Sequence, residues 1–306
     1  MTGTGRSRYA AFRRIQPRAP RLTPLRVRAR GLDFAAFTTP EIPGTTPLAC
    51  VNGGMIYSHG LLWPALSPLA ASRQLIFYDL RGRGASSAAP GPRQSRIEFD
   101  AGDLPAIRDA LGITRWDVLG HSWGGGIAML AAARDPLGVR RLVLTDAVGC
   151  TSEWIAGLHA TALARLEGRE RAMLEVLDPR LLHTDDPELH AEYSRALYPA
   201  WFVDRELGRA FAPPHETSVT GAAVAARLRR EGYDWRDDVR RIAATTIVLH
   251  GDGDLLSPDL ARATAEVIPH AAVALVGGAG HMPFWEQPAD FFQRVQSFLN
   301  APDRGI

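Results

Sequence analysis

The residues with the clearest chemical potential lie in the segment Gly-His-Ser-Trp-Gly at 120–124. A short apolar run over 116–119 precedes this segment, and apolar residues at helical spacing follow it over 123–133. Between a strand and a helix, the serine of G-x-S-x-G occupies a sharp turn that exposes its hydroxyl, and the glycines relieve crowding there. The start of the helix favours a developing negative charge. We therefore predict that Ser122 is a nucleophile.

A serine hydroxyl needs a base to take its proton. His281 lies in the glycine-rich segment 277–283, directly after the last apolar run that is typical of a strand. A loop in this place lets the side chain reach across the end of a sheet. His270 precedes the same run, which places it at the opposite edge of the sheet. We predict that His281 is the base.

The base in turn needs an acid to orient it, and in this arrangement the acid comes between serine and histidine in the chain. Asp254 lies in a G-x-x-D-x-x-x-P pattern at 251–258, after a predicted strand. Asp252 in the same turn and Asp146 at the end of an earlier strand are the alternatives. We favour Asp254 and expect Asp252 to brace the turn.

An oxyanion formed at the serine requires two backbone N–H groups aimed at it. The N–H of Trp123, directly after the serine, is the first candidate. The second is the N–H of Gly54 in the Asn-Gly-Gly turn at 52–54, because glycine lets the backbone approach a substrate closely. The predicted site is thus Ser122, His281 and Asp254, with Gly54 and Trp123 as donors.

The elements that must position these residues alternate between short apolar runs and helical patterns. A hairpin is predicted over 25–37, and strands over 48–52, 75–79, 116–119, 141–145, 246–249 and 272–276. Helices are predicted over 61–71, 99–111, 123–133, 259–268 and 288–299. Such alternation predicts an α/β fold with a mostly parallel central sheet flanked by helices.

Residues 148–240 break this alternation, because they contain helical patterns over 160–177, 187–197 and 221–230 and no strand pattern. We predict an inserted helical cap over the carboxyl ends of the strands, where ligands of such sheets bind. The arginines of 227–230 are expected to face solvent. Residues 1–24 are basic and aperiodic, so we expect a disordered tail without core contacts.

Composition excludes several classes of function. The chain of 306 residues has 35 basic residues, and nine of them lie in 1–30, which holds no acid. The remainder therefore carries 26 basic against 33 acidic residues. A surface with this excess of negative charge suits nucleic acid poorly. No apolar run approaches a membrane span, and Cys50 and Cys150 show neither disulfide nor metal spacing. We expect a cytoplasmic protein with buried thiols, a small-molecule substrate and no cofactor or metal, and leave a homo-oligomer open.

Five motifs in order carry a resemblance to a known superfamily. In chain order, these motifs are the Asn-Gly-Gly turn after 48–52, the turn Tyr-Asp-Leu-Arg-Gly-Arg-Gly-Ala-Ser at 78–86, the serine segment with Gly125, the Asp254 pattern, and Gly-His-Met-Pro-Phe-Trp-Glu at 280–286. The chain resembles the α/β-hydrolase superfamily over 25–301, and its proline iminopeptidase branch in particular. The resemblance implies a core over 25–147 and 241–301 and a cap over 148–240.

Two positions depart from that branch: Asn52 stands where it has histidine, and Met55 where it has proline. We expect Met55 to place a flexible, polarizable side chain beside the oxyanion loop, which suits an apolar acyl or lactone group. The resemblance implies that an iminopeptidase holds the amino group of its substrate with glutamates of the cap, and those available are Glu153, Glu192 and Glu206.

The sequence therefore predicts a cofactor-free serine hydrolase that cleaves a carboxylic ester or lactone of a small organic molecule through an acyl-enzyme. A proline iminopeptidase-type aminopeptidase is the alternative. A non-catalytic ligand-binding protein on the same fold ranks below both, since all three members of the Ser-His-Asp set are present.

Overall fold

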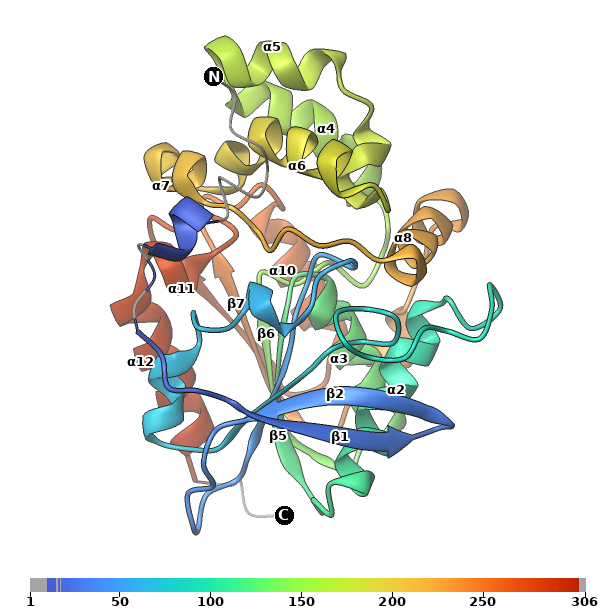
Figure 1. Cartoon of the computed structure of the whole chain (residues 1–306). Helices are drawn as coiled ribbons and strands as arrows, with labels where there is room; N and C mark the ends of the chain where they lie inside the picture. The colour runs from blue at the N-terminus through green and yellow to red at the C-terminus, as the bar shows by residue number, and fades with distance from the viewer. Residues whose placement is uncertain (1–9, 15, 17, 303–306) are drawn as a thin grey trace.

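A mixed sheet forms the centre of the computed structural model, which describes residues 10–14, 16 and 18–302 (Figure 1). Within these residues the sheet has eight strands in the order β1-β2-β4-β3-β5-β6-β7-β8. They are β1 (Thr23–Ala29), β2 (Leu32–Thr38), β3 (Leu48–Val51), β4 (Leu75–Tyr78), β5 (Trp116–His121), β6 (Val139–Thr145), β7 (Thr245–Gly251) and β8 (Ala271–Val276). Only the β1–β2 and β2–β4 pairs are antiparallel. The predicted α/β fold is confirmed.

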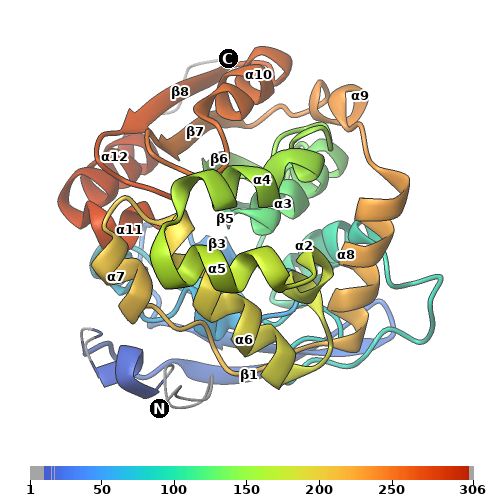
Figure 2. The same ribbon diagram turned by 90° about the horizontal axis from the view of Figure 1, so that it is seen from above.

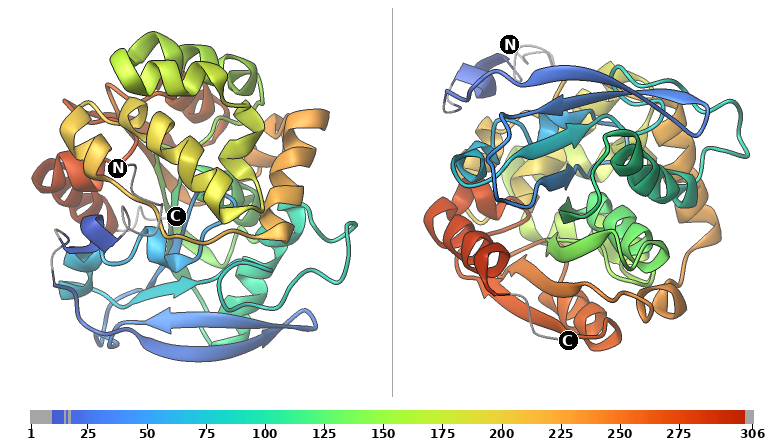
Figure 3. Two further views of the ribbon diagram at one scale, coloured as in Figure 1. Left: turned by 45° about the horizontal axis from the view of Figure 1, so that its top comes forward. Right: turned by 90° about the horizontal axis from the view of Figure 1, so that it is seen from below.

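Helices cover both faces of this sheet, as Figure 3 shows from below. Helices α2 (Ile97–Ala110), α3 (Trp123–Arg134) and α10 (Pro258–Val267) lie on one face, and α12 (Pro288–Asn300) lies on the other. Every residue of the central strands β3, β4 and β5 is buried. Strands covered on both faces need apolar side chains in both directions, which explains their continuous apolar runs.

The chain between β6 and β7 is helical and lies over one end of the sheet (Figures 1 and 2). Its α-helices are α4 (Trp154–Arg165), α5 (Gly168–Val176), α6 (Pro187–Leu197), α7 (Arg205–Ala210), α8 (Val219–Glu231) and α9 (Arg236–Val239). The helical pattern over 160–177 forms two helices, because Leu166 and Glu167 between them have extended backbones with ψ of 153° and 167°. In the described ranges no helix is long and apolar enough to cross a membrane.

The helix predicted over 61–71 does not form. The structure has two short 3₁₀ segments instead, η1 (His59–Leu61) and η2 (Ser67–Ala71). Pro64 and Pro68 lie within the predicted range, and a proline inside a helix lacks the N–H that the helix needs. The apolar spacing reflects burial, since Leu62, Leu66 and Leu69 are in the core.

Part of the arginine-rich segment packs on the folded body, so the expected absence of core contacts over 1–24 is wrong there. Residues 10–14 are helical, and the Phe12 side chain is only 3% exposed. Its ring meets Phe211 edge-on at 4.7 Å between centroids and Trp285 at 5.6 Å. Residues 1–9, 15 and 17 lie outside the described residues. The two aromatic residues of this segment, Tyr9 and Phe12, offer no periodicity from which the docking of Phe12 could be predicted.

We predict that Phe12→Ala lowers the free energy of unfolding by about 3 kcal/mol, because it removes a buried ring from an aromatic cluster. Urea denaturation followed by tryptophan fluorescence measures the change. Phe12→Leu is the control, and its cost is expected to stay below about 1.5 kcal/mol. An unchanged midpoint for Phe12→Ala would show that this segment does not stabilise the fold.

Candidate active site

Ser122 occupies the turn between β5 and α3, as the motif predicts. Its backbone has φ 53° and ψ −124°, a left-handed conformation that non-glycine residues rarely adopt. The turn is held by backbone hydrogen bonds, since Ser122 N donates to Thr145 O at 3.0 Å and Ser122 O accepts from Gly125 N at 2.9 Å. The strain is therefore maintained by neighbouring strands and the helix, which is typical of a functional position.

The glycines of the motif are required by close backbone approach. A Cβ at Gly124 would collide with the Val51 carbonyl oxygen, and one at Gly120 would collide with the Gly124 carbonyl oxygen. Helix α3 thus starts directly against the end of β3. The loop after β3 is close as well, because a Cβ at Gly53 would lie 2.6 Å from the Ser122 Cβ.

His281 and Asp254 form a buried pair. Nδ1 of His281 lies 2.9 Å from Oδ2 of Asp254, and the two residues are 4% and 0% exposed. Burial acts to raise the pKa of Asp254, but the His281 ring and its hydrogen bond, followed by His250 and the Leu256 N–H, outweigh burial and lower this pKa. The acid is thereby held as a carboxylate and leaves Nε2 of His281 as the other reactive nitrogen.

The two alternative acids have different surroundings. Oδ1 of Asp252 accepts from the Gly278 N–H at 2.8 Å, so this residue braces the turn as expected. Asp146 lies close to the pair, and its Oδ1 accepts from the Gly251 N–H at 2.8 Å. Burial and the Asp254 carboxylate raise the pKa of Asp146 well above its usual range. We therefore expect Asp146 to be a neutral acid beside the charged Asp254.

Within the described residues, Asp146, Asp254 and His281 also form the group of potential metal ligands, with their ligand atoms within 4.8 Å of one another. Three buried groups with one net carboxylate charge give a weak donor set for a divalent ion. The hydrogen bond between Asp254 and His281 instead suits an acid that orients a base.

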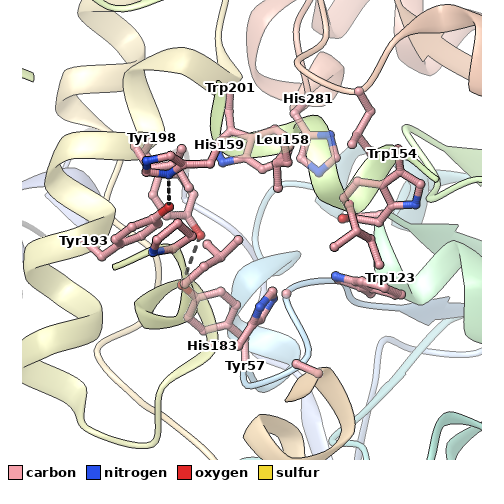
Figure 4. Close-up of a pocket in the computed structure, with 18 of the residues that line it drawn as sticks. Tyr57, Trp123, Trp154, Leu158, His159, His183, Tyr193, Tyr198, Trp201 and His281 are labelled. Carbon is pink, nitrogen blue, oxygen red and sulfur yellow. Dashed lines mark hydrogen bonds between the residues drawn. The ribbon is translucent and has the colours of Figure 1, made fainter. Parts of the chain in front are cut away.

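A pocket lies between the sheet end and the helices above it, and both Ser122 and His281 line it (Figure 4). Gly54 and Trp123, the predicted oxyanion donors, line it too. Trp123 is the first residue of α3, where N–H groups have no partner within the helix. From the helical segment the lining residues are Trp154, Ile155, Leu158, His159, Pro179, Leu182, His183, Tyr193, Leu197, Tyr198, Trp201, Ala225 and Arg229.

The pocket is mostly apolar and aromatic, and none of its lining residues is acidic. The glutamates considered for amine recognition, Glu153, Glu192 and Glu206, do not line it, and Glu206 is an exposed partner of Arg209. Met55 follows the Asn-Gly-Gly turn, but the expectation that its side chain suits an acyl or lactone group there is wrong. This side chain is 1% exposed and lies outside the pocket lining, while the Met55 carbonyl accepts from Nε of the buried Arg83 at 2.6 Å.

Two residues that the motifs did not identify hold His281 in place. The His281 N–H donates to Trp201 O at 2.7 Å, and the two rings lie 4.2 Å apart. On the other side, Nε2 of His121 lies 2.9 Å from the His281 carbonyl oxygen. Burial and the nearby His281 lower the pKa of His121 to about 3, so His121 is neutral and donates this bond. Its place inside the serine motif was the signal that could have identified it.

The expectation that the arginines of 227–230 face solvent is wrong at one position. Arg227 and Arg230 bind Glu231 at the surface, at 3.2 and 2.8 Å. Arg229, by contrast, lines the pocket and donates from Nη1 to Nδ1 of His183 at 3.0 Å. Helical periodicity explains the difference, because residue 229 shares a face of α8 with the buried Ala225.

The sequence profile of the α/β hydrolase fold family matches residues 46–288. This match covers most of the chain, so the chain belongs to that family. A 2-hydroxymuconate semialdehyde hydrolase of Pseudomonas putida is 29% identical over 238 residues, covering 76% of this chain and 79% of that protein. The proline iminopeptidase of Lactobacillus delbrueckii subsp. lactis is 24% identical over 291 residues, covering 86% and 93%. The chain is thus a hydrolase, and its resemblance to the proline iminopeptidase branch is confirmed.

Solved structures agree on the fold. The enol-lactonase from Burkholderia xenovorans superposes with a TM-score of 0.68 at 23% identity, covering 90% of this chain and 100% of that one. The proline iminopeptidase of Mycobacterium smegmatis also has a TM-score of 0.68, at 21% identity, covering 90% and 97%. Proteins named for different substrates therefore share this architecture, so the fold alone does not select among them.

We predict that Gly124→Ala destabilises the protein by more than about 3 kcal/mol, because the new methyl group meets a backbone carbonyl that cannot move aside. Gly157→Ala is the matched control. Gly157 lies within α4 with nothing near its missing Cβ, so this change is expected to stabilise by about 0.5–1 kcal/mol. Equilibrium unfolding in urea measures both. Equal effects of the two substitutions would contradict the close approach of α3 to β3.

Proposed function

We propose that this α/β hydrolase cleaves a carboxylic ester or lactone of a small organic molecule, with Ser122, His281 and Asp254 as its catalytic triad. The observation that carries the proposal is the pocket beside Ser122, which is apolar, aromatic and free of acidic lining residues. Such a lining suits an acyl or lactone group at Ser122. It offers no carboxylate to pair with the amino group of a peptide substrate, and a buried unpaired cation is strongly unfavourable.

In the proposed reaction the Ser122 oxygen attacks the substrate carbonyl while Nε2 of His281 takes the hydroxyl proton. The carbonyl oxygen becomes negative and accepts hydrogen bonds from the backbone N–H groups of Gly54 and Trp123. The C–O bond to the leaving group then breaks, and His281 returns the proton to the leaving oxygen. A water molecule, deprotonated by His281, attacks the acyl-enzyme and releases the acid and Ser122.

Asp254 acts on the histidine and not on the substrate. Its hydrogen bond to Nδ1 at 2.9 Å fixes the tautomer that leaves Nε2 free to accept a proton. Its negative charge also stabilises the imidazolium that forms during attack. The lowered pKa of Asp254 supports this role, because the group has to remain charged in a buried site.

The helical segment of residues 148–240 serves as a cap in this proposal. Its residues provide more than half of the pocket lining, including the Trp201 ring against His281. A cap of this kind excludes water from the oxyanion and strengthens the hydrogen bonds made to it. Aminopeptidase activity is the alternative, supported by the iminopeptidase relatives.

We expect p-nitrophenyl butyrate to be cleaved with a higher kcat/KM than proline p-nitroanilide after each rate is divided by its uncatalysed rate. The division removes the greater intrinsic reactivity of esters. Ser122→Ala is the control and should lose about 10³–10⁶-fold in turnover, together with labelling by a fluorophosphonate probe. A corrected preference for the proline amide that disappears when Glu153, Glu192 or Glu206 is replaced would establish the aminopeptidase instead.

Two isosteric substitutions separate the neighbouring acids. Asp254→Asn should reduce kcat by about 10³–10⁴-fold, since the amide no longer stabilises the imidazolium. Asp146→Asn should reduce kcat less than about tenfold, because an uncharged amide replaces an acid that is already neutral. Steady-state kinetics with p-nitrophenyl butyrate measures both. A larger loss for Asp146→Asn would transfer the orienting role to Asp146.

A further inference from the structure

Arg229 is a partly buried cation for which the described residues provide no ion pair. It lies on α8 and lines the pocket, where its hydrogen bond goes to the uncharged His183. The acid whose charge reaches it, Asp178, is bound by Nε of Arg180 at 2.8 and 3.0 Å. Burial is the main cause that lowers the pKa of Arg229. A desolvated guanidinium without a carboxylate is costly in an unliganded protein.

The groups next to Arg229 are neutral hydrogen-bonding side chains. Burial, followed by the Arg229 charge, lowers the pKa of His183 well below its usual value, so His183 is neutral. Because Nδ1 of His183 accepts from Arg229, its proton resides on Nε2, which becomes a second donor. Nδ1 of His159 lies 3.0 Å from the Tyr193 hydroxyl, and both of these residues line the pocket. Within the pocket lining, this region thus combines the charge of Arg229 with neutral polar groups, while Asp178 is the partner of Arg180 outside the lining.

This polar region lies across the pocket from the proposed nucleophile. Burial and the Asp178 charge raise the pKa of Tyr193, and the nearby Arg229 charge opposes them. Figure 4 places Tyr193 on the opposite side of the pocket from Trp123, the residue after Ser122. Apolar side chains such as Leu158 line the space between. A molecule that fills the pocket therefore meets the serine with one part and the guanidinium with another.

We propose that the pocket binds an ester or lactone that carries a carboxylate, which Arg229 holds through its guanidinium with His183 as a second donor. The inference rests on the proposed function, because it assumes that the reacting carbonyl lies at Ser122. A guanidinium matches a carboxylate in geometry and charge through two parallel N–H···O bonds. The bound anion supplies the paired carboxylate that the described residues do not provide for Arg229. A cationic amine would be repelled from the same place.

The test compares a neutral ester, p-nitrophenyl valerate, with the mono-p-nitrophenyl half-ester of glutaric acid, which has a carboxylate at the end of a similar chain. The quantity measured is the ratio of kcat/KM for the half-ester to that for the valerate. We expect Arg229→Gln to lower this ratio by roughly 10- to 100-fold and Arg229→Lys to lower it less, since a charge without the planar fork remains. Arg230→Gln, an exposed neighbour bound to Glu231, is the matched control and should leave the ratio unchanged.

An active esterase whose ratio is the same in Arg229→Gln and the wild type would overturn the inference and leave the proposed function standing. If the wild type cleaves neither ester, the proposed function fails, and calorimetric titration of the wild type with glutarate decides the inference by itself. Binding that is lost in Arg229→Gln supports the anion site, and absence of binding overturns it. The melting temperature of Arg229→Gln shows whether this variant folds. If it does not fold, the Arg229→Lys variant is measured in the same assays. A kcat/KM ratio of the two esters and a glutarate affinity equal to those of the wild type would then overturn the inference.

Discussion

The close approach of helix α3 to strand β3 is the constraint on which the rest of the site depends. Gly124 lies against the Val51 carbonyl, and the β3–β5 register pairs Val51 with Gly120. The loops that leave these two strands therefore start side by side, which brings Gly54 to the same pocket as Ser122. Backbone contacts fix this geometry, so the serine hydroxyl and the candidate oxyanion donors are positioned before any substrate binds.

The helical segment above the sheet takes part in positioning His281, the proposed base. Its Trp201 carbonyl accepts the His281 N–H, while His121 from the end of β5 holds the His281 carbonyl. Glu286 steadies the same loop by accepting from the Gly280 N–H at 2.6 Å. The histidine is therefore fixed jointly by the core and by the segment that also lines the pocket. A rearrangement of that segment would change substrate access and the position of the base together, which couples binding to chemistry.

The parts of the site that the sequence predicted are those that local backbone geometry dictates. Ser122, His281 and Asp254 follow predicted strands, and the structure brings His281 and Asp254 into hydrogen-bonding contact. The errors concern side chains whose direction depends on distant partners. Met55 turns its backbone toward the buried Arg83, and Arg229 turns into the pocket. A hydrophobicity pattern shows which face of an element is buried, but not whether that face meets the core or a ligand.

In the proposed function, the helical segment between β6 and β7 selects the substrate. A 2-hydroxymuconate semialdehyde hydrolase and a proline iminopeptidase match most of this chain at similar identity, so the motifs that carry the proposed serine chemistry do not select between substrates. Selection then falls to the pocket lining from α4 to α8, where a single charge has a large effect. Two like charges about 8 Å apart repel by about 2 kcal/mol at an effective dielectric constant of about 20, or roughly 30-fold in an equilibrium constant. Arg229, which has no ion pair among the described residues and lies in a lining without described acids, would by this interaction disfavour a cationic substrate and favour the proposed anionic one. No change in the residues around Ser122 is needed for this selection.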